Sequence, residues 1–461
     1  MPTLKLGNDA LLTLPTRITT PSIHIQKDGD HWYVPLFSGS KGAVVQSGDY
    51  NYTLGGLNVG IYRAAIGREE VVVIIDVFSN DSTTWILTSN GELYGCGSNS
   101  NGQQGSGNTN DVLTFTKRAE NVKEVSCSDN TTWYIDTSNN LYGCGYGYNG
   151  QQGSGASGYS AAVKTFTKRA SNVKTVSCTG STTWYIDNNN NLYGCGNNEY
   201  GNQGSNNTSN VSVFTKRASN VKEFACSANT TWYVDNNGSL YGCGYGFEGQ
   251  QGSGASGSSA NVLTFTKRAS NVKTVSCTDY TTWYIDTSNN LYGCGYGEYG
   301  QQGSGNDSDV ETFTKRAENV KTVSCTRLTT WYIDNNNDLY GCGRNSDGQQ
   351  GSNNRFDVET FTKRASNVKT VSCSYQTTWY IDNNNDLYGC GFNYGNQGSG
   401  NSSEVRKFTK RAENVKKVSC SDYTTWYIDN NNNLYVCGRN NYGQQGSGDT
   451  SGVRTFTKRD L

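Results

Sequence analysis

The feature that most constrains this chain is a tandem repeat with a period of about 49 residues. Each unit carries a Thr-Thr-Trp triplet, then Leu-Tyr-Gly-Cys-Gly, then Gly-Gln-Gln-Gly or a close variant, and closes on Phe-Thr-Lys-Arg. A fixed period of roughly 40–50 residues made of short strands is typical of the blades of a β-propeller. The tryptophan of the triplet marks eight units, at Trp85, Trp133, Trp184, Trp232, Trp283, Trp331, Trp379 and Trp426.

Each unit is expected to form a blade of four antiparallel strands. In the second unit the first three strands are predicted over Val122 to Cys127, Thr131 to Asp136 and Leu141 to Gly145. The fourth is either Val112 to Lys117 of the unit before or Val163 to Lys168 of the same unit. β-Branched and aromatic residues fill these runs, while Asn, Gly and Ser fill the gaps. Apolar side chains on both faces of the second strand favour blades that stack face to face.

We therefore predict an all-β protein with an eight-unit propeller over residues 71–461. A seven-bladed closure, and an exchange of strands between the first and last units, are the alternatives. Residues 1–70 contain none of the repeat motifs and hold all four prolines and both histidines. For them we predict a separate small β-rich domain that serves as an adaptor or anchor.

Composition and charge exclude several classes of partner. A formal net charge of −1 gives no reason to expect nucleic acid. No stretch approaches the roughly 20 apolar residues that cross a bilayer, so membrane insertion is not expected. The opening MPTLKLGNDALLTLPTR does not have the pattern of a signal peptide. We expect a soluble protein made in a reducing compartment.

The fifteen cysteines are predicted to form neither disulfides nor a metal site. Within a unit the two cysteines lie on strands separated by a third strand, which places them about 10 Å apart, too far for a disulfide. No Cys-x-x-Cys occurs, and both histidines lie outside the repeats, so no metal is expected. We interpret the cysteines as small core residues.

No cofactor site and no catalytic residue is predicted. Gly145 to Gly150 matches G-x-G-x-x-G by letter, but a strand follows it where a dinucleotide site requires a helix. The aspartate that ends the second strand, such as Asp136, recurs in register and is interpreted as a turn acceptor. The Lys-Arg pairs, such as Lys117-Arg118, are expected to pair with those aspartates at the blade edges; a cationic ring is the alternative.

The order Val-Lys-Thr-Val-Ser-Cys, Leu-Tyr-Gly-Cys-Gly and Gly-Gln-Gln-Gly resembles the regulator of chromosome condensation repeat family over about 390 of the 461 residues. The resemblance implies a propeller and a binding role. The chain departs from the family at Thr131-Thr132, where a His-Thr pair is usual, and at Cys144-Gly145, where Trp-Gly is usual. The family's best-known members have seven blades. Because no insertion resembles the founding member's GTPase-engaging wedge, nucleotide exchange is not carried over.

Comparison of the units with one another predicts a binding face. Residues between the first strand and the Thr-Thr pair change in nearly every unit, and so do residues that follow the third strand, whereas the other two links barely change. In an antiparallel blade the two variable loops emerge on the same face. Their Tyr-, Asn-, Gly- and Ser-rich composition suits recognition. The predicted partner-binding residues are Tyr148, Tyr200, Phe247, Tyr280, Tyr299, Arg327, Tyr375, Tyr394, Tyr423 and Tyr442.

Two alternatives to this binding face stay open. Exposed loops tolerate change, so the variation could be drift. The uniform face could instead be the docking surface, with its sameness imposed by a partner.

Two functional hypotheses follow, both without enzymatic activity. The first is a display module of a phage particle, as a capsid decoration or a tail or fibre protein, located in the virion. Residues 1–70 would anchor it to a protein assembly, and the variable face would bind a host-surface glycan or protein. The alternative is a cytoplasmic regulator that binds a protein partner such as a small GTPase.

Overall fold

A computed structural model describes the strands that lie between Thr3 and Ala65 and all of residues 72–461. The chain divides into two compact units, Met1–Val72 and Val73–Leu461. In the first unit β1 (Thr3–Leu6) forms an antiparallel pair with β2 (Ala10–Thr13). A four-stranded antiparallel sheet has the order β4 (Asp30–Pro35), β3 (Ser22–Lys27), β6 (Leu57–Ala65) and β5 (Asp49–Leu54). The adaptor role of this region stays a prediction.

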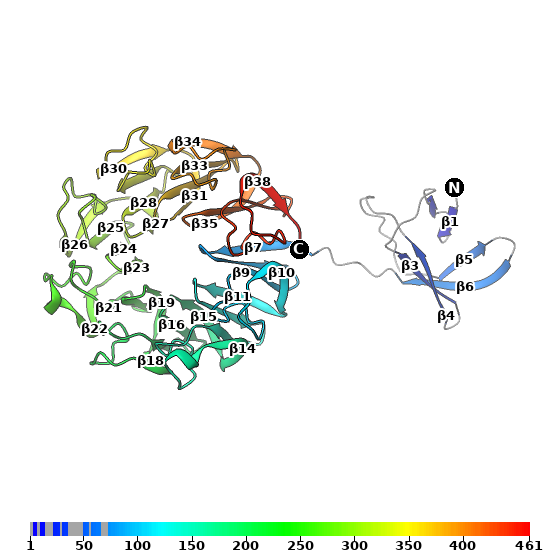
Figure 1. The fold of residues 1–461 in the computed structure, drawn as a ribbon, viewed down its shortest axis with the longest axis horizontal. Helices are drawn as coiled ribbons and strands as arrows, with labels where there is room; N and C mark the ends of the chain where they lie inside the picture. The colour runs from blue at the N-terminus through cyan, green and yellow to red at the C-terminus, as the bar shows by residue number, and fades with distance from the viewer. Residues whose placement is uncertain are drawn as a thin grey trace. The chain divides into compact units, whose positions relative to one another are not determined.

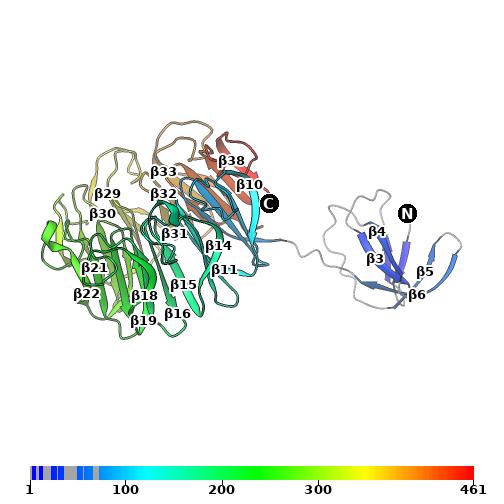
Figure 2. The same ribbon diagram turned by 60° about the horizontal axis from the view of Figure 1, so that its bottom comes forward.

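The second unit is a closed ring of eight four-stranded antiparallel sheets, the blades (Figures 1 and 2). In each blade four consecutive strands, here called A to D, follow one another outward from the ring axis. Blade 1 is β7 (Ile74–Ser79), β8 (Thr83–Thr88), β9 (Leu93–Gly97) and β10 (Val112–Ala119). Blade 2 is β11 (Val122–Cys127), β12 (Thr131–Asp136), β13 (Leu141–Gly145) and β14 (Val163–Ala170).

The remaining six blades repeat this order. Blade 3 is β15 (Val173–Cys178), β16 (Thr182–Asp187), β17 (Leu192–Gly196) and β18 (Val211–Ala218); blade 4 is β19 (Val221–Cys226), β20 (Thr230–Asp235), β21 (Leu240–Gly244) and β22 (Val262–Ala269). Blade 5 is β23 (Val272–Cys277), β24 (Thr281–Asp286), β25 (Leu291–Gly295) and β26 (Val310–Ala317); blade 6 is β27 (Val320–Cys325), β28 (Thr329–Asp334), β29 (Leu339–Gly343) and β30 (Val358–Ala365). Blade 7 is β31 (Val368–Cys373), β32 (Thr377–Asp382), β33 (Leu387–Gly391) and β34 (Val405–Ala412); blade 8 is β35 (Val415–Cys420), β36 (Thr424–Asp429), β37 (Leu434–Gly438) and β38 (Val453–Arg459).

The prediction of eight four-stranded blades is confirmed. The three strands predicted in the second unit begin and end at the predicted residues, and the fourth belongs to the same unit, at Val163–Ala170. The seven-bladed alternative is wrong. The exchange of strands between the first and last units is also wrong, because blades 1 and 8 each consist of four strands that are consecutive in the chain.

The hydrophobic core lies between blades rather than within them. Strand B is buried along nearly its whole length, because neighbouring blades cover both of its faces. Trp85 of blade 1, for example, shares a buried cluster with Val125 and Tyr134 of blade 2. The ring of Phe166 meets the rings of Trp85 and Tyr134 edge-on, at centroid distances of 5.8 and 4.9 Å. Such edge-to-face contacts suit the charge distribution of aromatic rings.

The ring closes without a shared strand. The last cluster combines Trp426 and Val436 of blade 8 with Ile74, Val77 and Ile86 of blade 1. Three residues here differ from the repeat. Ile74 is a small change from the Val of the other strands A, whereas Val436 stands where the other strands C have Gly, and Ile86 stands where the other strands B have Tyr. The side chains of Val436 and Ile86 are fully buried. The seam is therefore a variant of the ordinary blade interface, with its own pair of matched residues.

A backbone latch repeats at every interface. The loop between strands C and D of each blade donates one backbone N–H to strand D of the next blade, as from Gly107 N to Lys164 O at 2.8 Å. The seam has the same bond, from Gly448 N to Leu113 O at 2.9 Å. The eighth latch thus closes the ring with the geometry of the others.

The links between strands B and C, and between D and A, form the uniform face. Asn139 and Asn121 occupy left-handed backbone positions in these links, a conformation that Asn tolerates better than most residues. Asp136 Oδ1 accepts a bond from Asn140 N at 2.8 Å, so its predicted role as a turn acceptor is confirmed. Exposed lysines near the start of strand A lie on this face: Lys123, Lys174, Lys222, Lys273, Lys321, Lys369 and Lys416.

One sequence prediction about these charges is wrong. The lysines of Phe-Thr-Lys-Arg do not pair with the aspartates that end strand B, whose oxygens are already occupied by the turn. Three of them pair instead with carboxylates that precede strand C: Lys117 with Glu92 at 2.6 Å, Lys363 with Asp338 at 2.6 Å and Lys410 with Asp386 at 2.8 Å. These lysine side chains are exposed, so each pair adds little stability.

All fifteen cysteines are free, as predicted. The eight on strand C are buried, and each directs its Sγ at a backbone oxygen of the preceding blade, as Cys144 does to Gln103 O at 3.3 Å. Among the described residues the only helices are two three-residue 3-10 turns, η1 (Tyr159–Ala161) and η2 (Ser258–Ala260), and none is long and apolar enough to cross a membrane.

Candidate binding face

The loops that join strands A to B and C to D lie together on one face of the ring, here called the variable face. Hydrogen bonds join the two loop types across most of the blade interfaces. Gln103 Nε2, in the C–D loop of blade 1, donates to Asp129 O in the A–B loop of blade 2 at 3.1 Å. The seam has the equivalent bond, from Gln444 Nε2 to Asp81 O at 3.1 Å. The prediction that both loops share a face is therefore confirmed.

The constant residues of these loops form a scaffold for the variable ones. The second glutamine of the Gly-Gln-Gln-Gly motif is fully buried and holds its own strand C, as Gln152 Nε2 does to Cys144 O at 3.0 Å. A second scaffold residue recurs in five of the eight blades: Asn99, also fully buried, donates to Asn108 O and Asn110 O at 3.1 and 3.0 Å, which fixes the C–D loop. Because these side chains satisfy the loop backbone, neighbouring positions are free to differ from blade to blade.

The predicted residues on blades 2 to 4 belong to separate aromatic groups. Tyr148 lies 4.8 Å from Tyr159, and Tyr200 lies 4.7 Å from Tyr245, between ring centroids. Tyr245 in turn stacks on Phe247 at 6.2 Å. Tyr148 and Phe247 are 40% and 45% exposed, enough to meet a partner.

The predicted residues on blades 5 to 8 alternate with arginines. The Arg327 guanidinium lies 4.2 Å above the ring of Tyr280. Arg344 lies 6.0 Å from the ring of Tyr299 and 5.2 Å from that of Tyr375, and its Nη1 donates to the Tyr375 hydroxyl at 2.6 Å. Such stacking is a property of the planar guanidinium.

The alternation continues onto blades 7 and 8. Tyr394 stacks on Phe392, which meets Tyr423 edge-on. Arg439 lies 5.4 Å from the ring of Tyr423 and 5.7 Å from that of Tyr442. The structure thus groups Tyr280 with Arg327, Tyr299 with Tyr375, and Tyr394 with Tyr423 and Tyr442, while Tyr148, Tyr200 and Phe247 lie on other blades.

Sequence reasoning missed the position directly after Cys-Gly of strand C. This position connects the aromatic groups, and its occupants include Arg344 and Arg439. The signal was available, since the residue there differs among the units as much as those that were selected. It is occupied in turn by Ser98, Tyr146, Asn197, Tyr245, Tyr296, Arg344, Phe392 and Arg439.

The variable face is electrostatically uneven. The A–B and C–D loops of blades 1 to 5 contain no Lys or Arg, whereas those of blades 6 and 8 contain Arg327, Arg344, Arg355 and Arg439. On the acidic side, burial and the neighbouring Asp309 carboxylate, which accepts a hydrogen bond from the protonated Glu248 carboxyl, raise the pKa of Glu248 to about 7.

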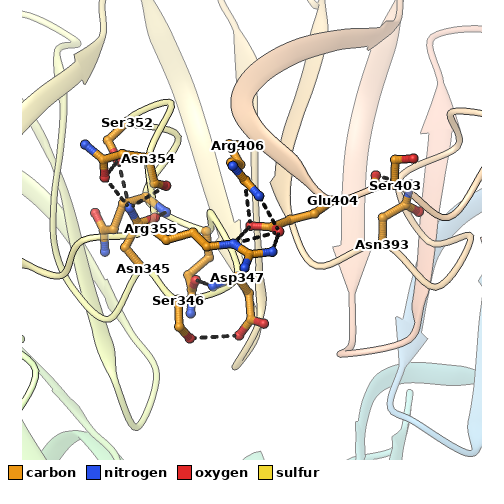
Figure 3. A network of polar contacts seen from close by, with 12 residues as sticks. Asn345, Ser346, Asp347, Ser352, Asn354, Arg355, Asn393, Ser403, Glu404 and Arg406 are labelled. Atoms are coloured by element: carbon orange, nitrogen blue, oxygen red, sulfur yellow. Dashed lines mark hydrogen bonds and ion pairs between the residues drawn. The ribbon is translucent and has the colours of Figure 1, made fainter.

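Some of these arginines are neutralised within the chain. Arg355 of blade 6 and Arg406 of blade 7 both point at the carboxylate of Glu404 (Figure 3). Arg355 Nε lies 3.1 Å from Glu404 Oε2, and Arg406 Nε lies 3.3 Å from Oε1. Arg344 Nη2 has a looser contact with Asp347 Oδ2, at 3.7 Å.

The side chains on this face suit non-covalent recognition. Stacked rings, guanidinium groups and amides supply flat surfaces and hydrogen bonds. Residues 72–461 contain no group of three or more His, Cys, Asp or Glu placed to hold a metal ion. The buried thiols have raised pKa values because burial disfavours the thiolate, so they are poor nucleophiles.

Comparison with known proteins agrees with this architecture. The model of the regulator of chromosome condensation (RCC1) repeat matches residues 74–103 and 415–444, which lie in blades 1 and 8. No curated protein matches the chain by sequence.

Solved structures share the fold at low sequence identity. Human WBSCR16 is 16% identical with a TM-score of 0.57, covering 72% of this chain and 96% of that one. Prp20p from Saccharomyces cerevisiae, whose structure was described with its binding to Gsp1p and histones, is 14% identical with a TM-score of 0.56, covering 76% of this chain and 91% of that one. Yeast RCC1 (Prp20) bound to Kap60 is 15% identical with a TM-score of 0.57, covering 80% of this chain and 94% of that one. The second unit is therefore an eight-bladed propeller whose first and last blades match the regulator of chromosome condensation repeat.

Proposed function

We propose that the propeller is a non-enzymatic binding platform that recognises a partner through its variable face. The supporting observation is that different positions in the loops hold the backbone and face a partner. The second glutamine of the motif, which holds strand C, is the same in all eight blades, and the asparagine that fixes the C–D loop recurs in five of them, while the residues presented by these loops change from blade to blade. Loops on a rigid scaffold are a common location for recognition residues. Structural neighbours with the same repeats bind proteins, and this favours a protein-binding role.

A pair of matched variants tests this proposal. One replaces exposed residues of the variable face, Tyr148→Ser, Phe247→Ser and Arg327→Ser, and the other replaces exposed lysines of the uniform face, Lys123→Ser, Lys174→Ser and Lys222→Ser. Wild type and both variants are used as baits in the native source, with cross-linking and mass spectrometry. We expect specific partners to be retained by the uniform-face variant and lost by the variable-face variant. The reverse pattern would make the uniform face the docking surface.

The location of the protein in a phage particle, with residues 1–70 as anchor, stays a prediction from the sequence. It predicts that the chain copurifies with particles and that deletion of residues 1–70 releases it. The alternative, a regulator of a small GTPase, predicts cross-links from the propeller to that GTPase and faster nucleotide release in its presence.

A further inference from the structure

The variable face has a polar cavity of about 250 Å³ between blades 7 and 8. The C–D loop of blade 7 contributes Tyr394 and Ser402 to its lining, and blade 8 contributes Arg439, Asn441 and Arg454, together with Asn440 and two glycines. The cavity lies beside the one C–D loop in which the repeat is a residue short, between Gly391 and Asn396. It is slightly smaller than a site for a drug-sized ligand, which has roughly 300–1,000 Å³.

The lining has two guanidinium groups and no carboxylate. Within the described residues neither Arg439 nor Arg454 belongs to an ion pair, in contrast to the neutralised Arg355 and Arg406 of the neighbouring blades. Arg439 is held in place by the rings of Tyr423 and Tyr442. The Asn441 carbonyl oxygen, turned toward the guanidinium, accepts from its Nε at 3.0 Å and its Nη2 at 3.1 Å. The cavity is therefore positively charged and fixed on one side.

The rest of the lining indicates what kind of anion fits. Tyr394 is 63% exposed and offers a flat ring at the cavity, and Asn441 and the Ser402 hydroxyl offer hydrogen bonds. A ligand here would meet one aromatic surface and otherwise only polar groups. A sugar ring has C–H groups on one face and hydroxyls at its edge, and a carboxylate pairs with a guanidinium through two parallel hydrogen bonds.

We propose that this cavity binds an anionic monosaccharide, with Arg439 and Arg454 contacting its acid group and Tyr394 contacting its ring. This inference rests on the proposed function of the variable face and names the ligand class of one site on it. The volume allows one ring, so the site would recognise a terminal or branching residue of a glycan rather than a continuous chain.

Calorimetric titration of the full-length protein tests the proposal. The probes are glucuronic acid and N-acetylneuraminic acid, with glucose, N-acetylglucosamine, glutamate and inorganic phosphate in parallel. We expect saturable binding of at least one acidic sugar, with a dissociation constant of roughly 0.1–1 mM for a ligand of this size. Neutral sugars should bind at least about tenfold more weakly, because they lack the charge-assisted bonds.

Matched variants test whether the acidic sugar binds in this cavity. Arg439→Gln and Arg454→Gln should each weaken it roughly 10- to 100-fold, the range for loss of a bond to a charged group. Arg406→Gln is the control, because Arg406 occupies the position of Arg454 on the preceding blade but is paired with Glu404, and it should leave binding unchanged. Tyr394→Ala should weaken binding, whereas Tyr159→Ala on blade 2 should not.

Several outcomes would overturn the inference. Absence of saturable binding by every probe would do so, as would equal weakening by Arg406→Gln. Equally tight binding of glutamate or phosphate would mean that the site reads charge alone and that the sugar assignment is wrong. None of these results bears on the partner-capture experiment, whose variable-face substitutions lie on blades 2, 4 and 6, so failure of the cavity and failure of the binding face are distinguishable.

Discussion

The seam between blades 8 and 1 supplies a quantitative test of how the ring closes. Val436 is fully buried where the other strands C have glycine, and it shares a cluster with Ile86, which replaces the usual tyrosine of strand B. Val436→Gly removes three buried carbon groups at about 0.8 kcal/mol each, and glycine in a strand adds roughly 0.5–1 kcal/mol. The expected loss in the free energy of unfolding is therefore about 3 kcal/mol.

The partner substitution should be costly alone and favourable in combination. Ile86→Tyr introduces a larger, aromatic side chain beside Val436 and should lower the free energy of unfolding by roughly 1–3 kcal/mol through overpacking. In the double variant the seam has the residues of an ordinary interface. In such an interface Tyr134 stacks on Tyr142 at 4.9 Å, and at the seam Tyr94 is in place to stack on the introduced ring in the same way. We expect the double variant to come within about 1 kcal/mol of wild type, so that the two changes are coupled by roughly 3 kcal/mol or more.

Urea unfolding of the four proteins, followed by tryptophan fluorescence and extrapolated linearly to zero urea, measures the cycle. Additive losses in the double variant would refute the reasoning. They would mean that Val436 and Ile86 are independent substitutions and that the seam is not a modified repeat interface.

Three further predictions concern the rest of the propeller. Gln444→Met should lower the free energy of unfolding by about 1 kcal/mol more than Gln301→Met does. The reason is that Gln444 Nε2 donates across the seam to Asp81 O, whereas Gln301 Nε2 has no partner within the described residues. Parallel urea titrations of the two variants measure the difference. The folded protein holds the proton of Glu248 more tightly than the unfolded chain does, so the contribution of Glu248 to stability falls as pH rises from about 4.5 to about 7. In Glu248→Gln the free energy of unfolding, measured across that range, should therefore depend less on pH. The eight strand C thiols are buried with raised pKa values, so iodoacetamide at pH 8 should label them, by mass spectrometry, only after unfolding; rapid labelling of the native protein would contradict the buried position.

Much of the propeller could be predicted from the sequence because the repeat averages out local ambiguity. One strand with Trp133 between Thr132 and Tyr134 is weak evidence, but eight copies at a fixed period fix the number and order of strands. The path of ring closure could not be predicted in the same way. It depends on the matched pair Ile86 and Val436. Taken singly, each of these residues looks like an isolated substitution of one apolar or small residue in the repeat.

The binding face was predicted at the level of its loops but not of its contacts. Comparison of units identified Tyr394 and Tyr442, because large aromatic residues in variable loops are conspicuous. It missed Arg439 and Arg454, which the pairing of Gly438 with Val453 in blade 8 brings together beside the shortened loop of blade 7. The charge pairing of the Lys-Arg motifs failed for a related reason: side-chain bonds within the turns had already occupied the aspartates.

The eighth latch also bears on where the chain could be cut. Blades 8 and 1 meet as other neighbouring blades do, yet no two-residue link joins strand D of blade 8 to strand A of blade 1, so continuity of the backbone at that point is dispensable. A circular permutant of residues 72–461 that joins Leu461 to Val72 and opens at Glu120-Asn121 would retain every interface described above. The propeller therefore requires no particular blade to come first in the chain. Because no strand is shared between the first and last blades, a duplicated unit could be inserted at any link between blades.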